Sequence, residues 1–314
     1  MTKFCAYIFA ETCETQAKCS SPMKPFVIVN PNAGSVKKMD VVRMHLERLR
    51  PAAVRMARRS REAERLTRLA LRRGERFIVA AGGDGTLNAI ANGIGSRARK
   101  VSLGLLPLGT GNDFARVLGL PATIEENIEV LRSWKTRRID LVRARSNRTR
   151  YFVNVSAGGF SGLVDEKLTA KIKKNWGPLS YLRSAAAALP QLHAYHTRVV
   201  IDGQEELATE LYNVVIANGR FVAGGLPIAP NADPSDGSLD LILIPKRTMA
   251  ETALLAAEIL LGKHLSNKAV IYRRAKKIFV RSRPGMWFNV DGELVGNAPV
   301  VFQIIAAALN FVVP

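Results

Sequence analysis

Short apolar runs that alternate with helix-patterned segments constrain the fold of this chain most. The runs Phe26–Asn30, Phe77–Ala81 and Val101–Leu106 are each followed by a turn rich in glycine or proline. A short apolar run bounded by turn residues is typical of a strand that is buried on both faces. Helical spacing over residues 37–50 and 60–73 lies between the first two runs. Strands and helices in alternation predict an α/β domain with a parallel sheet.

The pattern changes near Ile139 and Asp140, where apolar and polar residues begin to alternate. Such alternation is typical of antiparallel strands that have one face in the core. Helical spacing returns over residues 163–193 and 249–262. We therefore expect a second, β-rich domain that packs closely on the first. Its expected strands are Tyr151–Ser156, Arg198–Ile201, Leu211–Ala217, Leu239–Ile244, Lys277–Val280 and Trp287–Val290.

Composition narrows the choice of partners. Lys and Arg number 46 against 26 Asp and Glu, a formal charge of +20, which implies a polyanionic partner: nucleic acid, an acidic membrane surface or a phosphorylated ligand. No run reaches the roughly 20 apolar residues that a membrane span needs.

The three cysteines, Cys5, Cys13 and Cys19, all lie near the start of the chain. We expect residues 1–23 to be a mobile extension and the core to lack disulfides.

Two glycine turns follow successive strands of the predicted sheet. Gly82–Thr86 and Gly109–Asp113 would both face the crevice at the carboxyl ends of the strands, where open α/β sheets bind ligands. Glycines let the backbone approach a phosphate, and a helix N-terminus offers it free N–H groups. Asp84 could orient a hydrated cation; a plain strand–helix turn capped by Thr86 is the alternative explanation of the first turn. Thr110 stands where a Walker A loop needs lysine, which excludes a P-loop.

Carboxylates gather at two places in the second half. The block Pro230–Asp240 contains Asp233 and Asp236. Such oxygen donors suit magnesium, but an Asp-Pro or Asp-Gly turn explains the same residues. Asp291 and Glu293 flank a glycine, a pattern that could supply a general base or form a plain hairpin turn. No rival catalytic set occurs, since the four histidines lack the HExxH spacing and no Gly-x-Ser-x-Gly elbow is present.

Basic residues cluster in two segments, Arg43–Arg76 and Lys263–Arg283. They are interpreted either as solvated faces or as surfaces that attract anionic lipid.

Six blocks in this order resemble the diacylglycerol-kinase catalytic-domain family, which includes soluble bacterial diacylglycerol kinases, YegS-like lipid kinases, and sphingosine and ceramide kinases. The resemblance covers about residues 25–314. The blocks are Val29-Asn-Pro-Asn-Ala-Gly34, Gly82-Gly-Asp-Gly-Thr-Leu-Asn88, Leu106-Pro-Leu-Gly-Thr-Gly-Asn-Asp-Phe-Ala-Arg116, Asn154-Val-Ser-Ala-Gly-Gly-Phe160, Ala229 to Leu241 and Asp291-Gly-Glu293.

The resemblance implies an α/β N-terminal domain with a parallel sheet, like those of NAD kinase and phosphofructokinase, followed by an antiparallel β-sandwich. It also implies that the chain end returns to the first domain. The nucleotide-binding domain would comprise residues 24–139 and 304–314, and the lipid-substrate domain residues 140–303.

The resemblance assigns roles to particular residues. Asp84, Asp113 and Asp140 would form an acidic network around a catalytic Mg²⁺ ion. Glu293, with Asp291 beside it, would accept the proton of the lipid hydroxyl. Asp236, helped by the backbone carbonyls of Asp233 and Ser238, would bind a structural Mg²⁺ ion. ATP would contact Asn30, Pro31, Asn32, Ala33, Gly34, Gly82, Gly83, Asp84, Gly85, Thr86, Leu87, Asn88, Ala89, Gly109, Thr110 and Asn112.

Two positions depart from the family pattern: Ala89 stands where glutamate is frequent, and Ala57 where a threonine often contacts the nucleotide.

The resemblance implies an ATP- and Mg²⁺-dependent lipid kinase, with diacylglycerol as the first expected substrate and phosphatidic acid as product. Sphingoid bases, ceramide, monoacylglycerol and phosphatidylglycerol are alternative substrates, and NAD kinase is a rival enzyme. A non-catalytic, basic membrane- or nucleic-acid-binding protein is a rival of another class. We expect a cytoplasmic enzyme, peripherally and reversibly bound to anionic membrane surfaces, able to form a homodimer and without a nucleic-acid partner.

Overall fold

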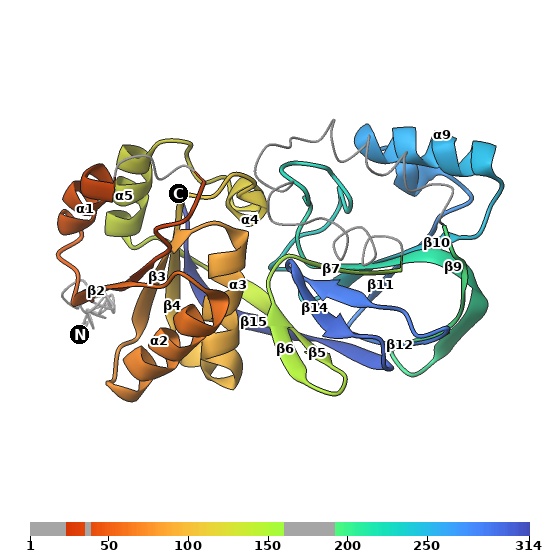
Figure 1. Ribbon diagram of the computed structural model, residues 1–314, viewed down its shortest axis with the longest axis horizontal. Coiled ribbons are helices and arrows are strands. Elements are labelled where there is room, and N and C mark those ends of the chain that lie inside the picture. Colours follow the sequence, from red (N-terminus) through yellow and green to blue (C-terminus); the bar gives the residue numbers. More distant parts are fainter. Residues whose placement is uncertain (1–22, 35–38, 160–191) are drawn as a thin grey trace, which may run out of the picture.

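The structure, a computed structural model, describes residues 23–34, 39–159 and 192–314 (Figure 1). Except for Met23, the expected N-terminal extension lies outside the described residues. The helix expected over 163–193 also lies outside them, apart from its last two positions.

The first half of the chain is built on a parallel sheet. Its strands are β1 (Phe26–Val29), β2 (Ala53–Met56), β3 (Phe77–Gly82) and β4 (Ser102–Pro107). They lie in the order β4-β3-β1-β2, and each neighbouring pair is parallel. All residues of β1 and β3 are buried.

Helices cover both faces of this sheet, which explains the unbroken apolar runs. Val27 and Val29 of β1 pack with α1 (Met39–Glu47) and α5 (Ile124–Ser133). Phe26 and Ile28 pack with α2 (Ser60–Arg72) and α3 (Asp84–Ile94) on the other face. Successive residues of a strand point to opposite faces, so both alternate sets must be apolar. A short 3₁₀ helix, η1 (Gly95–Lys100), follows α3.

The second half is an antiparallel β-sandwich with a helix on its outer side. Phe288 makes an edge contact with Phe302, with ring centroids 5.3 Å apart, and both lie in the core between the layers. Leu255 of α9 packs on the opposite face of β9 and β10. The strands and helices are β5 (Thr136–Arg145), β6 (Thr149–Phe152), β7 (Val155–Gly159), β8 (Tyr195–Ile201), β9 (Glu205–Ala217), β10 (Leu239–Pro245), α9 (Met249–Leu260), η3 (His264–Ser266), β11 (Ile271–Ala275), β12 (Lys277–Arg283), β13 (Phe288–Val290), β14 (Glu293–Gly296) and β15 (Val300–Val312).

The long strand β15 joins the two halves. It pairs antiparallel with β12 and β5, and at Asn310 and Phe311 it pairs in parallel with β4. The described strands thereby form one 15-stranded sheet. The expected domain boundaries, 139/140 and 303/304, fall inside β5 and β15, so continuous strands connect the halves.

The fold class predicted from the sequence, a parallel α/β part followed by an antiparallel β-sandwich, is confirmed. Of the helices that the structure describes, none has the length and apolar character to span a membrane.

Candidate active site

Asp84 and Asp113 stand at the carboxyl ends of neighbouring strands. Asp84 is the first residue of α3, after β3, and Asp113 is the first residue of α4 (Asp113–Val117), after β4. The Asp84 carboxylate accepts hydrogen bonds from the backbone N–H groups of Asp113 and Phe114, both at 3.0 Å. Because β3 and β4 are adjacent and parallel, their two turns meet at one edge of the sheet.

The Asp113 carboxyl is buried beside the Asp84 carboxylate. Burial, and to a smaller extent the Asp84 charge, raise the pKa of Asp113. The hydrogen bond from the Gly224 N–H and the charge of the Arg116 guanidinium lower it, but they do not cancel the increase. Asp113 accepts hydrogen bonds from Gly224 at 3.0 Å and from Arg116 at 3.1 Å. Two neighbouring carboxylates favour a cation between them, and Mg²⁺ typically takes one or two carboxylates together with phosphate oxygens and water. The residues present therefore fit a magnesium ion.

The glycine turns touch each other, and the lack of side chains makes this contact possible. A Cβ atom on Gly109 would lie 2.5 Å from the Cα atom of Gly83. Asn112, at φ 50°, closes the second turn: its side chain accepts from the Gly109 N–H at 3.0 Å and donates to the Gly109 carbonyl at 2.7 Å. A Cβ atom on Gly34 would lie 2.2 Å from the Thr110 hydroxyl oxygen, so the turn after β1 joins the same cluster.

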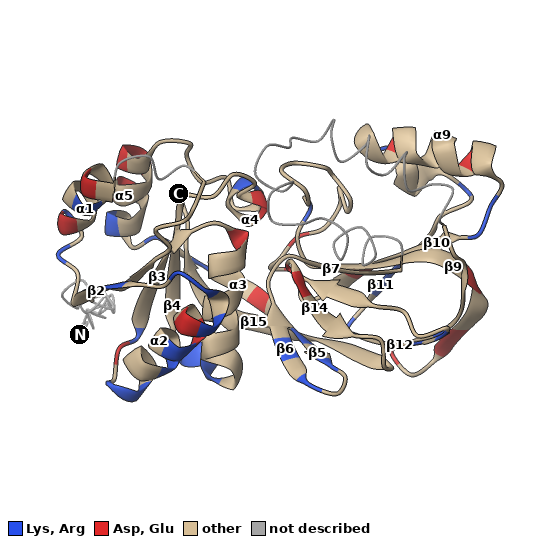
Figure 2. Cartoon of the chain, viewed as in Figure 1, with Lys and Arg blue, Asp and Glu red and all other residues tan. Residues whose placement is uncertain are grey.

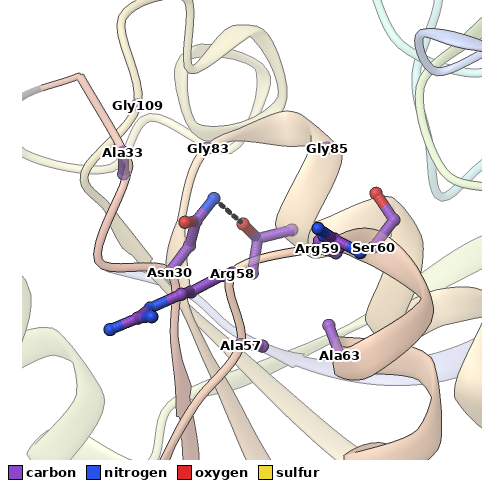
Figure 3. Close-up of a pocket in the computed structure, with 11 residues that line it drawn as sticks. Asn30, Ala33, Ala57, Arg58, Arg59, Ser60, Ala63, Gly83, Gly85 and Gly109 are labelled. Atoms are coloured by element: carbon purple, nitrogen blue, oxygen red, sulfur yellow. Dashed lines mark hydrogen bonds between the residues drawn. The ribbon is translucent and has the colours of Figure 1, made fainter.

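A cavity of about 290 Å³ opens beside these turns (Figure 3). The Asn30 amide donates a hydrogen bond to the Thr86 hydroxyl at 3.4 Å within its lining. Gly83, Gly85 and Thr86, at the start of α3, line the cavity, and a helix N-terminus suits phosphate. Six residues expected at the nucleotide line the cavity: Asn30, Ala33, Gly83, Gly85, Thr86 and Gly109.

The other residues expected at the nucleotide do not line this cavity. Asn88 is buried, and its amide donates to the Val290 carbonyl at 3.4 Å, so it ties α3 to the second half of the chain. A Cβ atom on Gly82 would lie 2.4 Å from the Thr86 hydroxyl oxygen, so Gly82 makes room for Thr86. The residues expected at the nucleotide that do not line the cavity are Pro31, Asn32, Gly34, Gly82, Asp84, Leu87, Asn88, Ala89, Thr110 and Asn112.

The connection from β2 to α2 contributes cavity residues that the sequence analysis did not assign to the nucleotide. Arg58 and Arg59 line the cavity beside Asn30, and Ser60 begins α2 there (Figure 3). From the sequence, we expected both arginines in a basic segment facing solvent or lipid. Recognition of β2 as a strand would have located them, because its carboxyl end lies at the same sheet edge as those of β1 and β3.

Asp140 of β5 connects β15 with the turn before β10 through hydrogen bonds. Its carboxylate accepts hydrogen bonds from the Ala307 N–H at 2.6 Å and the Gly237 N–H at 2.8 Å. Burial raises the pKa of Asp140, the two N–H donors oppose the shift, and the charges of Asp236 and Asp233 add to it. The expected part of Asp140 in an acidic network with Asp84 and Asp113 stays a prediction.

The Asp236 carboxylate, expected at a structural magnesium ion, already has a cationic partner, Arg274. Asp233, expected to contribute its backbone carbonyl, accepts from Arg137 at 2.6 Å through its side chain. Asp236 also accepts from the Ser238 N–H at 2.9 Å. Within the described ranges, no group of three or more His, Cys, Asp or Glu side chains is arranged to hold a metal ion. A magnesium ion at this turn stays a prediction.

The hairpin between β13 and β14 carries Asp291 beneath the connection from β6 to β7. The Asp291 carboxylate accepts from the N–H groups of Val153 at 3.1 Å, Asn154 at 3.4 Å and Val155 at 2.9 Å. Burial raises the pKa of Asp291 to about 7. The negative charge of Asp84 also raises this pKa, whereas the hydrogen bonds from the three N–H groups lower it. Asp291 therefore braces the hairpin that presents Glu293.

Glu293 is held by a basic residue from the neighbouring hairpin. The Arg150 guanidinium lies 3.5 Å from the Glu293 carboxylate, and also bonds Glu64 of α2 at 2.5 Å. Arg68 bonds the second oxygen of Glu64 at 2.6 Å. This chain of charges links the first half of the molecule to the carboxylate expected to act as base, and no pattern in the sequence predicted it.

Comparison with known proteins identifies the family. Residues 24–144 match the diacylglycerol kinase catalytic domain, and residues 154–313 match the YegS C-terminal NAD kinase beta sandwich-like domain. A diacylglycerol kinase from Staphylococcus haemolyticus is 35% identical over 241 residues, covering 77% of this chain and 71% of that protein. The chain belongs to the diacylglycerol kinase family. A family member from Staphylococcus saprophyticus is 36% identical over 222 residues, covering 71% of this chain and 72% of that protein.

The expected resemblance is thus confirmed, and the chain is an enzyme of the lipid kinase class. Solved structures agree in fold. A diacylglycerol kinase from Bacillus anthracis superimposes with a TM-score of 0.72 at 19% identity, covering 94% of this chain and 98% of that chain. An NAD kinase from Archaeoglobus fulgidus, in complex with ATP, gives a TM-score of 0.51 at 16% identity, covering 92% and 93%.

Proposed function

We propose that this member of the diacylglycerol kinase family transfers the γ-phosphoryl group of ATP to the hydroxyl group of diacylglycerol, giving phosphatidic acid, and that it requires Mg²⁺. One observation carries the proposal. The Asp84–Asp113 pair lies beside a cavity built from glycine turns, and the Asp291–Glu293 hairpin from the other half approaches the same edge. Phosphoryl transfer depends mainly on positioning and on charge neutralisation, which this arrangement supplies.

The cavity would hold the phosphates of ATP. Gly83, Gly85 and Gly109 let the backbone approach phosphate oxygens, and the N–H groups at the start of α3 would donate to them. Arg58 and Arg59 would neutralise negative charge from the opposite wall. When bound, Mg²⁺ would lie at Asp84 and Asp113 and neutralise the charge on the phosphoryl oxygens.

Glu293 would accept the proton of the attacking hydroxyl. An alcohol keeps its proton at neutral pH until attack is advanced, so the base must be positioned and ionised throughout. The Arg150 guanidinium, 3.5 Å from the Glu293 carboxylate, would help to position it. Asp291 would fix the hairpin and would not itself take the proton, because backbone N–H groups already occupy its carboxylate.

The proposed reaction places the enzyme at a membrane, because diacylglycerol resides in the bilayer. We propose that the enzyme is cytoplasmic, where ATP is supplied, and binds the bilayer peripherally and reversibly. Its excess of basic residues supports an attraction to anionic lipid.

Incubation with ATP labelled on the γ-phosphate, Mg²⁺ and a mixed lipid extract tests the function. We expect labelled phosphatidic acid, no product after chelation of Mg²⁺, and no product from Asp84→Ala. NAD, sphingoid base, ceramide, monoacylglycerol and phosphatidylglycerol, each offered separately, test the alternative acceptors. Label entering one of them faster than diacylglycerol would overturn the proposed substrate.

A further inference from the structure

Helix α9 presents an apolar stripe to solvent. Of its twelve residues, all of which the structure describes, Leu255 is buried. Ala250, Leu254, Ala257 and Leu261, at or just beyond its end, are exposed. Their spacing of three to four residues places them on one side of a helix. We name these four residues the α9 stripe; Leu254 is 59% exposed and Leu261 is 69% exposed.

The acidic side chains of α9 are engaged away from the stripe. The Glu251 carboxylate closes a capping box, accepting from the Thr248 N–H at 3.0 Å and from the Thr248 hydroxyl at 2.7 Å. The Glu258 carboxylate accepts from the Asn267 amide at 2.6 Å. The stripe itself is therefore uncharged, and the two carboxylates are held by local partners.

Basic residues flank the stripe at both ends. Lys246 and Arg247 precede the helix, Lys263 follows it, and all three are exposed. Lys246 forms a surface ion pair with Glu210 at 3.2 Å, which leaves it in contact with solvent. In Figure 2, α9 is mostly tan, and blue segments lie in the chain that connects it to the sheet. An apolar helix side with cations at its borders matches a bilayer that has anionic headgroups above acyl chains.

The segment after α9 packs on the loop that reaches the acidic cluster. His264 is fully buried, and its Nε2 atom lies 2.9 Å from the Ile228 carbonyl oxygen. Gly224, in the same loop, donates its N–H to Asp113 at 3.0 Å. In Figure 1, α9 and α4 lie along the same side of the molecule. A bilayer in contact with α9 would thus lie on the side where this loop meets Asp113.

We propose that the α9 stripe is the surface by which this protein docks on an anionic lipid bilayer. The proposal rests on the proposed function, since a kinase of bilayer lipid must bind that bilayer. A second copy of the chain fits less well. A stable dimer buries about 800 Å² on each partner, and two leucines with two alanines offer far less apolar area. Hydrophobic insertion by the stripe would add to the charge attraction of the flanking cations.

Co-sedimentation with vesicles tests the stripe. The variant Leu254→Ser/Leu261→Ser should bind vesicles of phosphatidylcholine and phosphatidylglycerol about tenfold more weakly than the wild type, because two inserted side chains are lost. The matched control is Val41→Ser/Met44→Ser on α1, which also removes two exposed apolar side chains, 39% and 56% exposed. The control should bind as the wild type does. Binding to pure phosphatidylcholine vesicles should be weaker for all three proteins.

A second measurement separates this proposal from the proposed function. Both variants should keep wild-type activity on diacylglycerol dispersed in detergent micelles, where no bilayer must be bound. If no protein phosphorylates diacylglycerol in micelles, the proposed function fails, while vesicle binding still tests the stripe. Equal vesicle binding by wild type and stripe variant would overturn the inference. So would a wild-type dimer in sedimentation equilibrium that the stripe variant loses while its vesicle binding persists.

Discussion

Among the single residues, Asp291 and Glu293 lie in one turn but have different partners. Asp291 accepts hydrogen bonds from the backbone N–H groups of Val153, Asn154 and Val155. Glu293 is partly exposed and faces Arg150. One carboxylate is therefore suited to holding the hairpin, and the other to exchanging a proton.

We predict that Glu293→Gln lowers kcat by roughly 100-fold or more, because amide cannot accept the hydroxyl proton. ATP affinity, measured by calorimetry, should stay at the wild-type value. The control is Glu206→Gln, which alters a Glu–Arg pair of similar kind with Arg198 on β8. Turnover near that of the wild type would remove Glu293 from the role of base.

A second residue-scale prediction concerns pH. The pKa of Asp291 is raised by burial from 3.8 to about 7. The folded protein therefore binds this proton more tightly than the unfolded chain does. The corresponding stability is fully present below the unfolded pKa and is lost as pH rises through 7.

Urea unfolding in magnesium-free buffer checks this sign. Between about pH 5 and about pH 8, the wild type should lose roughly 1 to 3 kcal/mol more unfolding free energy than Asp291→Asn does. Other titrating groups act on both proteins, so the difference isolates Asp291. Parallel pH profiles would show that the Asp291 pKa is not displaced.

Among the elements, the edge strand β2 determines the position of Arg58 and Arg59, which follow it in the chain. β2 is short, is only partly buried and contains Arg55, so it lacks the apolar run that identified β1, β3 and β4. Its parallel pairing with β1 carries the following residues to the ligand-binding edge of the sheet. Arg58 and Arg59 consequently line the cavity.

We predict that Arg58→Ala/Arg59→Ala raises the KM for ATP about tenfold, because hydrogen bonds to charged groups are lost. Arg61→Ala is the matched control, since Arg61 is exposed one residue into α2 and does not line the cavity. The increase should be the same with micelles and with vesicles. A defect confined to vesicles would return these arginines to a membrane-facing role.

At the scale of the whole molecule, β15 makes the two halves one sheet. Its pairing changes between Ile305 and Leu309, where Ala307 adopts φ 51° and donates its N–H to the Asp140 carboxylate. The same carboxylate accepts from Gly237 in the turn before β10. Asp140 therefore fixes the junction between the halves.

We predict that Asp140→Asn lowers the free energy of unfolding by about 1 to 3 kcal/mol, because one of the two N–H groups that bond the buried Asp140 carboxylate loses its acceptor. Asp202→Asn is the matched control. Its exposed carboxylate also accepts from two backbone N–H groups, those of Lys276 and Lys277, which water can reach. Denaturant unfolding of both variants gives the comparison, and equal losses would show that burial of Asp140 does not matter.

Much of the fold was predictable because its signals are local. The buried runs of β1, β3 and β4, and the glycine turns that end them, are each written within a few residues. The order of these turns along parallel strands predicted that both would face one crevice, and the family resemblance placed Asp84 and Asp113 together there. The backbone N–H of Asp113 donates to the Asp84 carboxylate in the structure, across the adjacent strands β3 and β4.

The sequence by itself determined the α/β pattern, the glycine turns and the carboxylates that follow them. The family resemblance also implied that the chain end returns to the first domain, where β15 pairs with β4. Folding in three dimensions was needed to bring Arg58 and Arg59 to the cavity and to place Arg150 between Glu64 and Glu293. The physical reason is the separation of the partners along the chain. A strand or a turn follows from the preferences of adjacent residues, whereas an ion pair between distant residues exists only after the chain has folded.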